Sequence, residues 1–275
     1  AGGHAAAVLE QLDQRGLLVG FERDPAVFKS IPAHLKKDSR VELINCSYWF
    51  MKRELERLGI EEVDVIYFDL GICSYHLEHS KRGFSFQNRE EPFDCRFNAE
   101  SDTPPAWKLI NDSSPAQIKK ILRQYGEVRQ PAAIVYAIEE RKPVKKVSDI
   151  CEAVEKAVIP PRQKGELARV FQAFRIAVNR ELVELESSLE TALDLLAEGG
   201  RLAVISFHSL EDRIVKHFFR EQARDCICPP QLPVCACDKK ARCRVVNRSP
   251  IIPGKEEIEA NPRARSAKLR VAEKI

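Results

Sequence analysis

The sequence lacks long apolar runs, internal repeats and low-complexity tracts. No stretch approaches about 18 uninterrupted apolar residues, which excludes a membrane-spanning helix within the printed chain. With 44% hydrophobic and 31% charged residues over 275 positions, the composition is that of a globular protein rather than a disordered one. The length suits one large domain or two smaller ones.

The net charge is also small, +3, but it is unevenly distributed. Residues 239–275 hold eleven Lys and Arg against four Asp and Glu, and residues 119–146 hold eight against three. Two basic segments on a nearly neutral chain favour a polyanionic partner such as a nucleic acid. A solvated surface of mixed charge is the alternative interpretation.

The nine cysteines do not follow a secreted, disulfide-rich pattern. Four are scattered among apolar or loop positions: Cys46, Cys73, Cys95 and Cys151. That usage is typical of a reduced, cytoplasmic protein. The other five crowd into residues 226–243.

A C-x-C-x6-C-x-C array lies in that crowded segment, formed by Cys226, Cys228, Cys235 and Cys237. Four thiolates this close in sequence can hold a tetrahedral zinc ion that stabilises a short loop. Free or redox-active thiols are the alternative. The array contains no His or carboxylate, which argues against a catalytic metal.

Short apolar runs alternating with helical segments predict an α/β fold. The runs interpreted as buried strands are residues 17–21, 41–44, 63–68, 202–207 and 267–272. Helical segments separate the first three runs, which is the βαβ pattern of a parallel sheet. Apolar residues recurring every three or four positions predict one long helix from about Glu166 to Glu198, with Gly199-Gly200 as its stop.

About 130 residues separate the third and fourth runs, far more than one crossover requires. Part of this stretch, residues 102–165, is polar, basic and helical in pattern, with helices expected to begin at Pro115 and Val147. We therefore expect an inserted helical subdomain at 102–165. It would interrupt an α/β domain made of residues 1–101 and 166–275, the latter carrying the Cys-rich loop 226–243 and a basic C-terminal tail.

Residues suited to a nucleoside-containing cofactor follow the expected strands. Gly2-Gly3-His4 precedes a helix, where glycines admit a ligand to the backbone N–H groups. Glu22 ends the next strand about 20 residues later, where such folds place an acid on ribose hydroxyls. Asp69 ends the third strand, so it should face the same cleft. A solvated turn at Glu22 and a loop cap at Asp69 are the alternatives.

Two further segments carry polar and aromatic candidates. Aromatic residues alternate with Arg over residues 82–97, which suits stacking on an unpaired base, or anchoring of a loop in the core. After the fourth strand, Ser209 is the expected N-cap of a helix with Asp212 as its capping-box partner, and His208 lies at the strand end. No third residue at a diagnostic spacing marks a hydrolase triad.

These strings, taken together and in order, resemble the bacterial ribosomal RNA small subunit methyltransferase H family. The matching segments are residues 1–4, 69–71, 82–86, 171–179, 207–213 and 261–266. The resemblance covers the whole chain. The family's N-terminal segment and first strand have no counterpart, so we expect an N-terminally truncated chain.

The resemblance implies a Rossmann-like class I S-adenosylmethionine-dependent methyltransferase sheet, and methylation of N4 of a cytidine at the decoding centre of 16S rRNA. It further implies S-adenosyl-L-methionine as cofactor, 16S rRNA or the small ribosomal subunit as partner, and no membrane. The cofactor-binding positions it implies are Gly2, Gly3, His4, Glu22, Tyr48, Asp69 and His76. Tyr48 stands where the family commonly has Phe beside the adenine, and His76 where it often has Gln.

The methyl acceptor requires a hydrogen-bond acceptor for its exocyclic amine, because the lone pair of that amine is delocalised into the ring. Asp94 or the 206–212 loop, with His208, is the candidate. The sequence lacks the N/D/S-P-P-Y string that many amino-methyltransferases use.

Two alternative functions share some of these features. An NAD-dependent oxidoreductase would share the glycine loop and Glu22, whereas a non-catalytic RNA-binding assembly factor would need only the basic segments.

Overall fold

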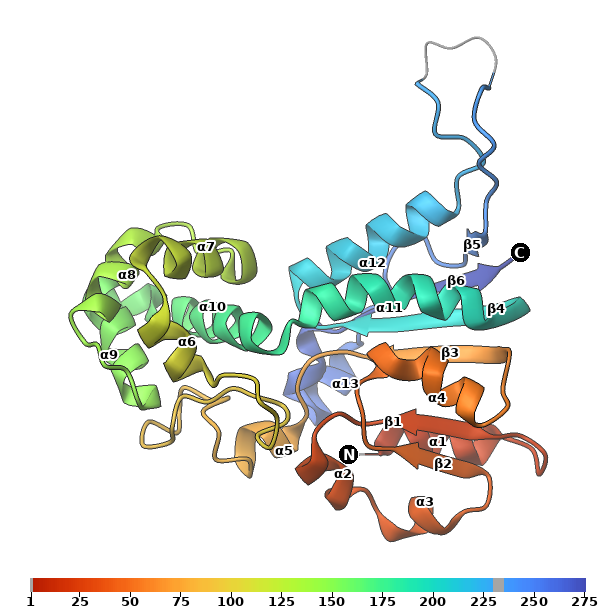
Figure 1. Cartoon of the computed structure of the whole chain (residues 1–275), viewed down its shortest axis with the longest axis horizontal. Helices are drawn as coiled ribbons and strands as arrows, with labels where there is room; N and C mark the ends of the chain where they lie inside the picture. Colours follow the sequence, from red (N-terminus) through yellow and green to blue (C-terminus); the bar gives the residue numbers. More distant parts are fainter. Residues whose placement is uncertain (1, 230–234) are drawn as a thin grey trace. The chain divides into compact units, whose positions relative to one another are not determined.

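The computed structural model describes residues 2–229 and 235–275. Ala1 of the glycine motif and positions 230–234 of the Cys-rich loop therefore lie outside the described residues. The chain forms two compact units. The first contains Ala1–Tyr48 and Ile72–Glu181, and the second contains Trp49–Gly71 and Leu182–Ile275 (Figure 1).

The first unit opens with a small α/β layer. Its strands β1 (Leu18–Phe21) and β2 (Val41–Ile44) pair in parallel, with Leu18 opposite Val41. The helices around them are α1 (Gly3–Gln11), α2 (Pro25–Ser30) and α3 (Ala33–Lys37), and the 3-10 helix η1 (Tyr48–Phe50) follows β2. Both strands form where the apolar runs predict them.

The rest of the first unit is helical. It contains α5 (Ser74–Glu78), α6 (Ala106–Asp112), α7 (Pro115–Gly126), α8 (Pro131–Glu139), α9 (Val147–Ala157) and α10 (Pro160–Asn179). The expected helix starts at Pro115 and Val147 are confirmed, and Ser114 caps α7 reciprocally with Gln117. Gly126 lets α7 approach α10, since a Cβ there would lie 2.6 Å from the Arg169 carbonyl oxygen.

The helices from α6 to α10 share one continuous apolar core. Phe93, Ile118, Ile150 and Phe174 are fully buried in it. Phe93 precedes the segment 102–165 and Phe174 follows it, so the helices of that segment share their core with flanking residues. The boundaries of the expected inserted subdomain stay a prediction.

The second unit is built on a four-stranded mixed sheet of order β3-β4-β6-β5. The strands are β3 (Val63–Asp69), β4 (Leu196–Ser206), β5 (Cys243–Val245) and β6 (Lys268–Lys274). Strands β3 and β4 are parallel, whereas β6 runs antiparallel to both β4 and β5. The helices are α4 (Met51–Arg57), α11 (Glu181–Leu195), α12 (Ser209–Gln222), α13 (Lys255–Ala260) and the 3-10 helix η2 (Pro262–Ser266). The predicted α/β fold class is confirmed.

The predicted single helix from Glu166 to Glu198 is wrong. Arg180 adopts a left-handed conformation with φ of 54°, which ends α10 at Asn179 before α11 begins at Glu181. Gly199-Gly200 is not the helix stop either, because α11 ends at Leu195 and both glycines lie within β4. None of the described helices is both long and apolar enough to span a bilayer.

Candidate active site

The start of α1 offers an open backbone surface. Gly2 has a φ of 86° and no side chain caps the helix there. A Cβ on Gly2 would lie 2.8 Å from the Leu35 side chain, whereas a Cβ on Gly3 would meet nothing within 4 Å. A helix N-terminus with an open glycine at its first turn suits a negatively charged ligand group. The exposed side chain of His4 lies on the same turn.

Glu22 directly follows β1 at the carboxyl edge of the parallel pair. Its backbone N–H donates to the Ile44 carbonyl (3.1 Å), which extends the pairing by one residue. Its Oε1 accepts from the Asp24 amide at 2.8 Å, and Asn45 donates to the Glu22 carbonyl at 2.6 Å. The carboxylate is therefore held in place at the strand end. Tyr48 follows β2 in η1 and is half-buried.

Burial raises the pKa of Glu22 above its ordinary value of 4.5. A raised folded-state pKa means that the protonated form favours folding, so the free energy of unfolding falls as pH rises from about 4.5 through the folded-state pKa. Glu22→Gln stays neutral and lacks this fall. We expect the variant to gain stability over the wild type across that window and to keep the gain above it. Urea unfolding between about pH 4 and about pH 8 measures the difference; a constant difference would contradict the burial argument.

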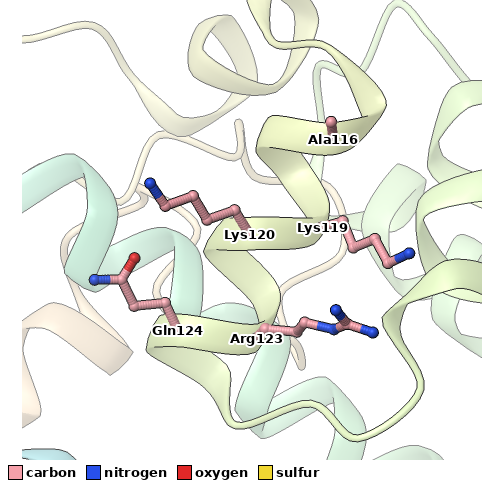
Figure 2. A pocket seen from close by; sticks show the side chains of 5 residues that line it. All are labelled: Ala116, Lys119, Lys120, Arg123 and Gln124. Carbon is pink, nitrogen blue, oxygen red and sulfur yellow. The ribbon is translucent and has the colours of Figure 1, made fainter.

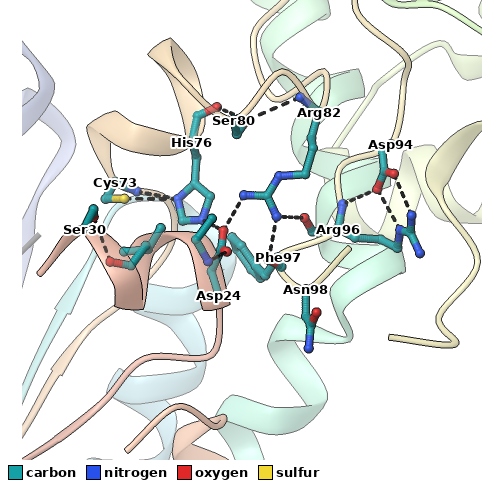
Figure 3. A network of polar contacts seen from close by, with 12 residues as sticks. Asp24, Ser30, Cys73, His76, Ser80, Arg82, Asp94, Arg96, Phe97 and Asn98 are labelled. Carbon is teal, nitrogen blue, oxygen red and sulfur yellow. Dashed lines mark hydrogen bonds and ion pairs between the residues drawn. The ribbon is translucent and has the colours of Figure 1, made fainter. Parts of the chain in front are cut away.

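Behind Glu22 lies a buried polar network centred on Asp24, which is only 1% exposed (Figure 3). Its Oδ1 accepts from the Ala26 amide at 2.8 Å and so caps α2. Its Oδ2 lies 3.0 Å from His76 Nε2 and also pairs with the Arg82 guanidinium. Burial alone would raise the pKa of Asp24, but the hydrogen bonds from His76 and Arg82 outweigh it and hold the pKa below its ordinary value.

Both ring nitrogens of His76 make contacts that hold the imidazole in place. Nδ1 accepts from the Cys73 amide at 3.1 Å, which places the ring proton on Nε2 facing Asp24. Phe84 and Phe97 pack against the ring with centroids 5.0 and 5.1 Å away. The sequence predicted His76 as a cofactor contact; the structure places both ring nitrogens in contacts within the protein.

Arg82 links this network to the end of α10. Its guanidinium donates to the carbonyls of Arg96 (2.9 Å) and Phe97 (2.6 Å). Asn179 Oδ1 then accepts from the Phe97 amide at 2.8 Å, and Asn179 Nδ2 donates to the Cys95 carbonyl at 2.7 Å. The aromatic and arginine-rich segment 82–97 is thus anchored in the protein interior.

Asp94, the predicted hydrogen-bond acceptor, forms a two-pronged ion pair with Arg96. Asp94 Oδ1 accepts from Arg96 Nε and Oδ2 from Arg96 Nη2, each at 2.8 Å (Figure 3). The Arg96 amide also donates to Oδ1 at 3.0 Å. The catalytic role of Asp94 stays a prediction. Its contacts show that it holds the Arg96 side chain in place.

In the second unit, Asp69 and His208 lie at one sheet edge. Asp69 ends β3 opposite Ile205 of β4, and the Leu70 amide donates to the Ile205 carbonyl at 3.1 Å. Because β3 and β4 are parallel, Asp69 and the loop after β4 share the carboxyl edge. His208 lies two residues beyond β4.

The expected cap of α12 is one residue out of register. His208 is the N-cap, and its Nδ1 accepts from the Glu211 amide at 3.4 Å. Glu211 Oε2 accepts from the His208 amide in return at 3.3 Å, and it also accepts from the Phe207 amide at 2.8 Å. Asp212 binds Arg270 instead, at 2.7 Å. Ser209-Asp212 as the capping pair is therefore wrong, because an imidazole nitrogen replaces the expected hydroxyl.

The predicted site residues fall into two groups, one in each unit. Gly2, Gly3, His4, Glu22, Tyr48, His76 and Asp94 belong to the first unit, and Asp69 and His208 to the second. Sequence reasoning missed Asp24 and Asn179 and gave Arg82 no polar role. The local signal for Asp24 was Asp24-Pro25, which is typical of a helix start, and Arg82 and Asn179 lie in the matching segments 82–86 and 171–179.

Comparison with known proteins extends over the whole chain. A family model described as the MraW methylase family matches residues 1–275. A relative from Heliobacterium modesticaldum is 44% identical over 283 residues, covering 100% of this chain and 90% of its own length. One from Dehalococcoides mccartyi is 43% identical over 277 residues (100% and 79%), and one from Clostridioides difficile 38% over 281 residues (99% and 89%). Each is named ribosomal RNA small subunit methyltransferase H.

Proposed function

Because this chain belongs to the MraW methylase family, we propose that it transfers a methyl group from S-adenosylmethionine to N4 of a cytidine in small-subunit ribosomal RNA. The observation that carries this is the full-length match to the family, which confirms the resemblance seen in the motifs. The chain is an S-adenosylmethionine-dependent rRNA methyltransferase, so the oxidoreductase and assembly-factor alternatives are set aside.

The residues of the first unit fit such a cofactor. An S-adenosylmethionine molecule carries a ribose diol, an adenine ring and a charged methionyl group. Glu22 at the end of β1 suits the diol, because one of its two carboxylate oxygens remains available. Among the described contacts Oε1 accepts a hydrogen bond from the protein, and Oε2 accepts none. The open turn at Gly3 suits the methionyl carboxylate. The proposed set is completed by Tyr48 beside the adenine, by Asp69 near the adenine and methionyl portions, and by Gly2 and His4 in the glycine loop.

His76 takes a different part in this proposal. With both ring nitrogens in protein contacts, it acts as a positioning residue that fixes Asp24. Asp24 in turn donates its backbone N–H to the Glu22 carboxylate at 2.8 Å. The network therefore holds the carboxylate proposed to bind the ribose.

When bound, S-adenosylmethionine supplies an activated methyl group, so the protein contributes mainly orientation. The target base must be unpaired or extruded to reach the site. Asp94 is proposed to accept a hydrogen bond from the exocyclic amine as its nitrogen rehybridises. His208, whose Nδ1 already accepts from the Glu211 amide and whose Nε2 lies 3.1 Å from Glu211 Oε1, is proposed to position the loop after β4. We propose the cytoplasm as the place of action, which the scattered free cysteines support.

The RNA-binding surface is proposed to be the basic face of α7. Lys119, Lys120 and Arg123, with Ala116 and Gln124, line an open hollow of about 420 Å³ (Figure 2). Within the described residues, none of these three cations is ion-paired. Other basic side chains of the helical region do pair with carboxylates: Arg141, Lys142, Lys146 and Lys156. The α7 face therefore holds unneutralised charge for a phosphate backbone.

Isothermal titration with S-adenosylmethionine and with NAD tests the proposal. We expect the methyl donor alone to bind. Glu22→Gln should weaken that binding about 10- to 100-fold, because charge-assisted hydrogen bonds worth roughly 1.5–3 kcal/mol become neutral ones. Glu10→Gln, on the exposed face of α1, is the matched control and should bind as the wild type does. Equal affinity in both variants would remove Glu22 from the site, and binding of NAD alone would overturn the function.

A further inference from the structure

The four cysteines of the C-x-C-x6-C-x-C array converge in the structure. They lie on two described segments of the second unit, residues 223–229 after α12 and residues 235–242 before β5 (Figure 1). All four Sγ atoms lie within 4.8 Å of one another. The two segments thus contribute two sulfur atoms each to one compact cluster.

The spacing of the sulfurs matches tetrahedral thiolate coordination. Sγ of Cys235 lies 3.4 Å from Cys226, 3.6 Å from Cys237 and 4.0 Å from Cys228, and Cys226 lies 3.7 Å from Cys237. A zinc–sulfur distance of about 2.3 Å in a tetrahedron places the sulfurs about 3.8 Å apart. A disulfide would require about 2.05 Å, and all four cysteines are free.

Apolar burial does not account for the cluster. No described residue between Arg224 and Lys240 is buried. A short segment without a core needs another source of stability, and a structural metal is a common one. The sulfurs also accept backbone N–H groups: Cys226 from the Cys228 amide (3.3 Å), Cys228 from the Ala236 amide (3.3 Å) and Cys237 from the Ile227 amide (3.4 Å). Such donors stabilise thiolates, the form that binds metal.

We propose that Cys226, Cys228, Cys235 and Cys237 bind one Zn²⁺ ion that folds this Cys-rich segment. With four protein thiolates as ligands there is no open position for water or substrate, so the site is structural. Soft thiolate donors in tetrahedral array select zinc over oxygen-preferring cations. This site is independent of the methyl-transfer site and of its cofactor.

The base of the segment is already tied to the rest of the second unit. The Arg242 amide donates to the Gln222 carbonyl at 2.8 Å, and the Ala241 amide to Asp225 Oδ1 at 3.2 Å. The buried Cys243 then enters β5. Zinc binding would hold the two segments together beyond this base, where no described residue is buried.

Metal analysis of the untagged, purified chain is the first test. We expect about one zinc per chain by mass spectrometry of the dissolved metal. Replacement with Co²⁺ should give the intense visible bands of a tetrahedral ion and a thiolate-to-cobalt charge-transfer band in the near ultraviolet. A chain with four reactive thiols, no zinc and no tetrahedral cobalt spectrum would overturn the proposal. So would iron in place of zinc, or disulfides among these four cysteines.

A double variant, Cys226→Ser with Cys237→Ser, should lose the metal, and Cys46→Ser is the control that should keep it. Zinc should also protect the segment from trypsin at Arg224, Lys239 and Lys240. We expect faster cleavage there in the double variant and in chelator-treated wild type. If the double variant fails to fold, the cobalt spectrum and the chelator experiment on the wild type still decide. Equal cleavage with and without zinc would contradict a folding role.

Discussion

Asp24→Ala is expected to destabilise the first unit by about 3–5 kcal/mol, because it removes one partner from a buried ionic network. His76 and Arg82 would both lose the Asp24 carboxylate, and His76 is 5% exposed. Loss of the α2 cap adds about 1 kcal/mol. Such a change is a large fraction of the stability of an ordinary domain. Urea unfolding at neutral pH measures it.

Asp38→Ala is the matched control for this experiment. Asp38 also pairs with an arginine, Arg40 at 2.9 Å, but both side chains are about a quarter exposed (24% and 27%). A pair in contact with water is worth roughly 0–1 kcal/mol. Similar losses in the two variants would mean that the Asp24 network does not stabilise the unit. Asp24→Asn should recover part of the stability, since an amide can still cap α2.

Neutralising the basic face of α7 is expected to weaken rRNA binding by about 30- to 100-fold near physiological salt. The change is Lys119→Gln, Lys120→Gln and Arg123→Gln together, which line one hollow. Each phosphate contact to a single strand contributes about 0.7 to the slope of log affinity against log salt, so the slope should fall by about 2. Titration of a fragment of small-subunit rRNA at several salt concentrations measures both quantities.

A second triple variant, which removes three other positive charges from the helical region, is the control. Arg141, Lys146 and Lys156 are bound to Glu152, Glu90 and Glu140, at 3.0, 2.7 and 2.8 Å. Their replacement by Gln should leave the salt slope almost unchanged, because their charge is already neutralised. If both triple variants lost affinity equally, overall charge rather than the α7 face would explain the binding.

The sequence predicted the positions of most strands, because a buried strand needs a short apolar run and little else. It did not predict how they pair: among the described residues β3 pairs with β4, in a different sheet from β1 and β2. It missed β5, whose three residues are too short for a pattern. It also ran α10 and α11 together. Apolar residues keep the helical spacing through Arg180, and a single residue at positive φ leaves no mark on that spacing.

The candidate site was predictable only where motifs are local. The glycine turn and Glu22 were found from their spacing; the structure places Gly2 and Gly3 at the start of α1 and Glu22 directly after β1, and their part in binding a nucleoside stays a prediction. The Asp24 network was not found, because its members come from positions 24, 76, 82 and 179, which only the fold brings together. Charge counting likewise could not separate the unpaired cations of α7 from the paired ones nearby.

The division of the chain into two discontinuous units constrains the order in which it folds during synthesis. The segment Trp49–Gly71 belongs with Leu182–Ile275, so β3 emerges from the ribosome long before β4, its parallel partner, exists. The first unit can close once Glu181 has been made, while β3 must wait. Until then Val65, still 63% exposed in the folded chain, is part of an apolar strand without a neighbour. Such delayed pairing is expected to slow folding, because the edge of β3 stays unpaired and open to aggregation until β4 has been made.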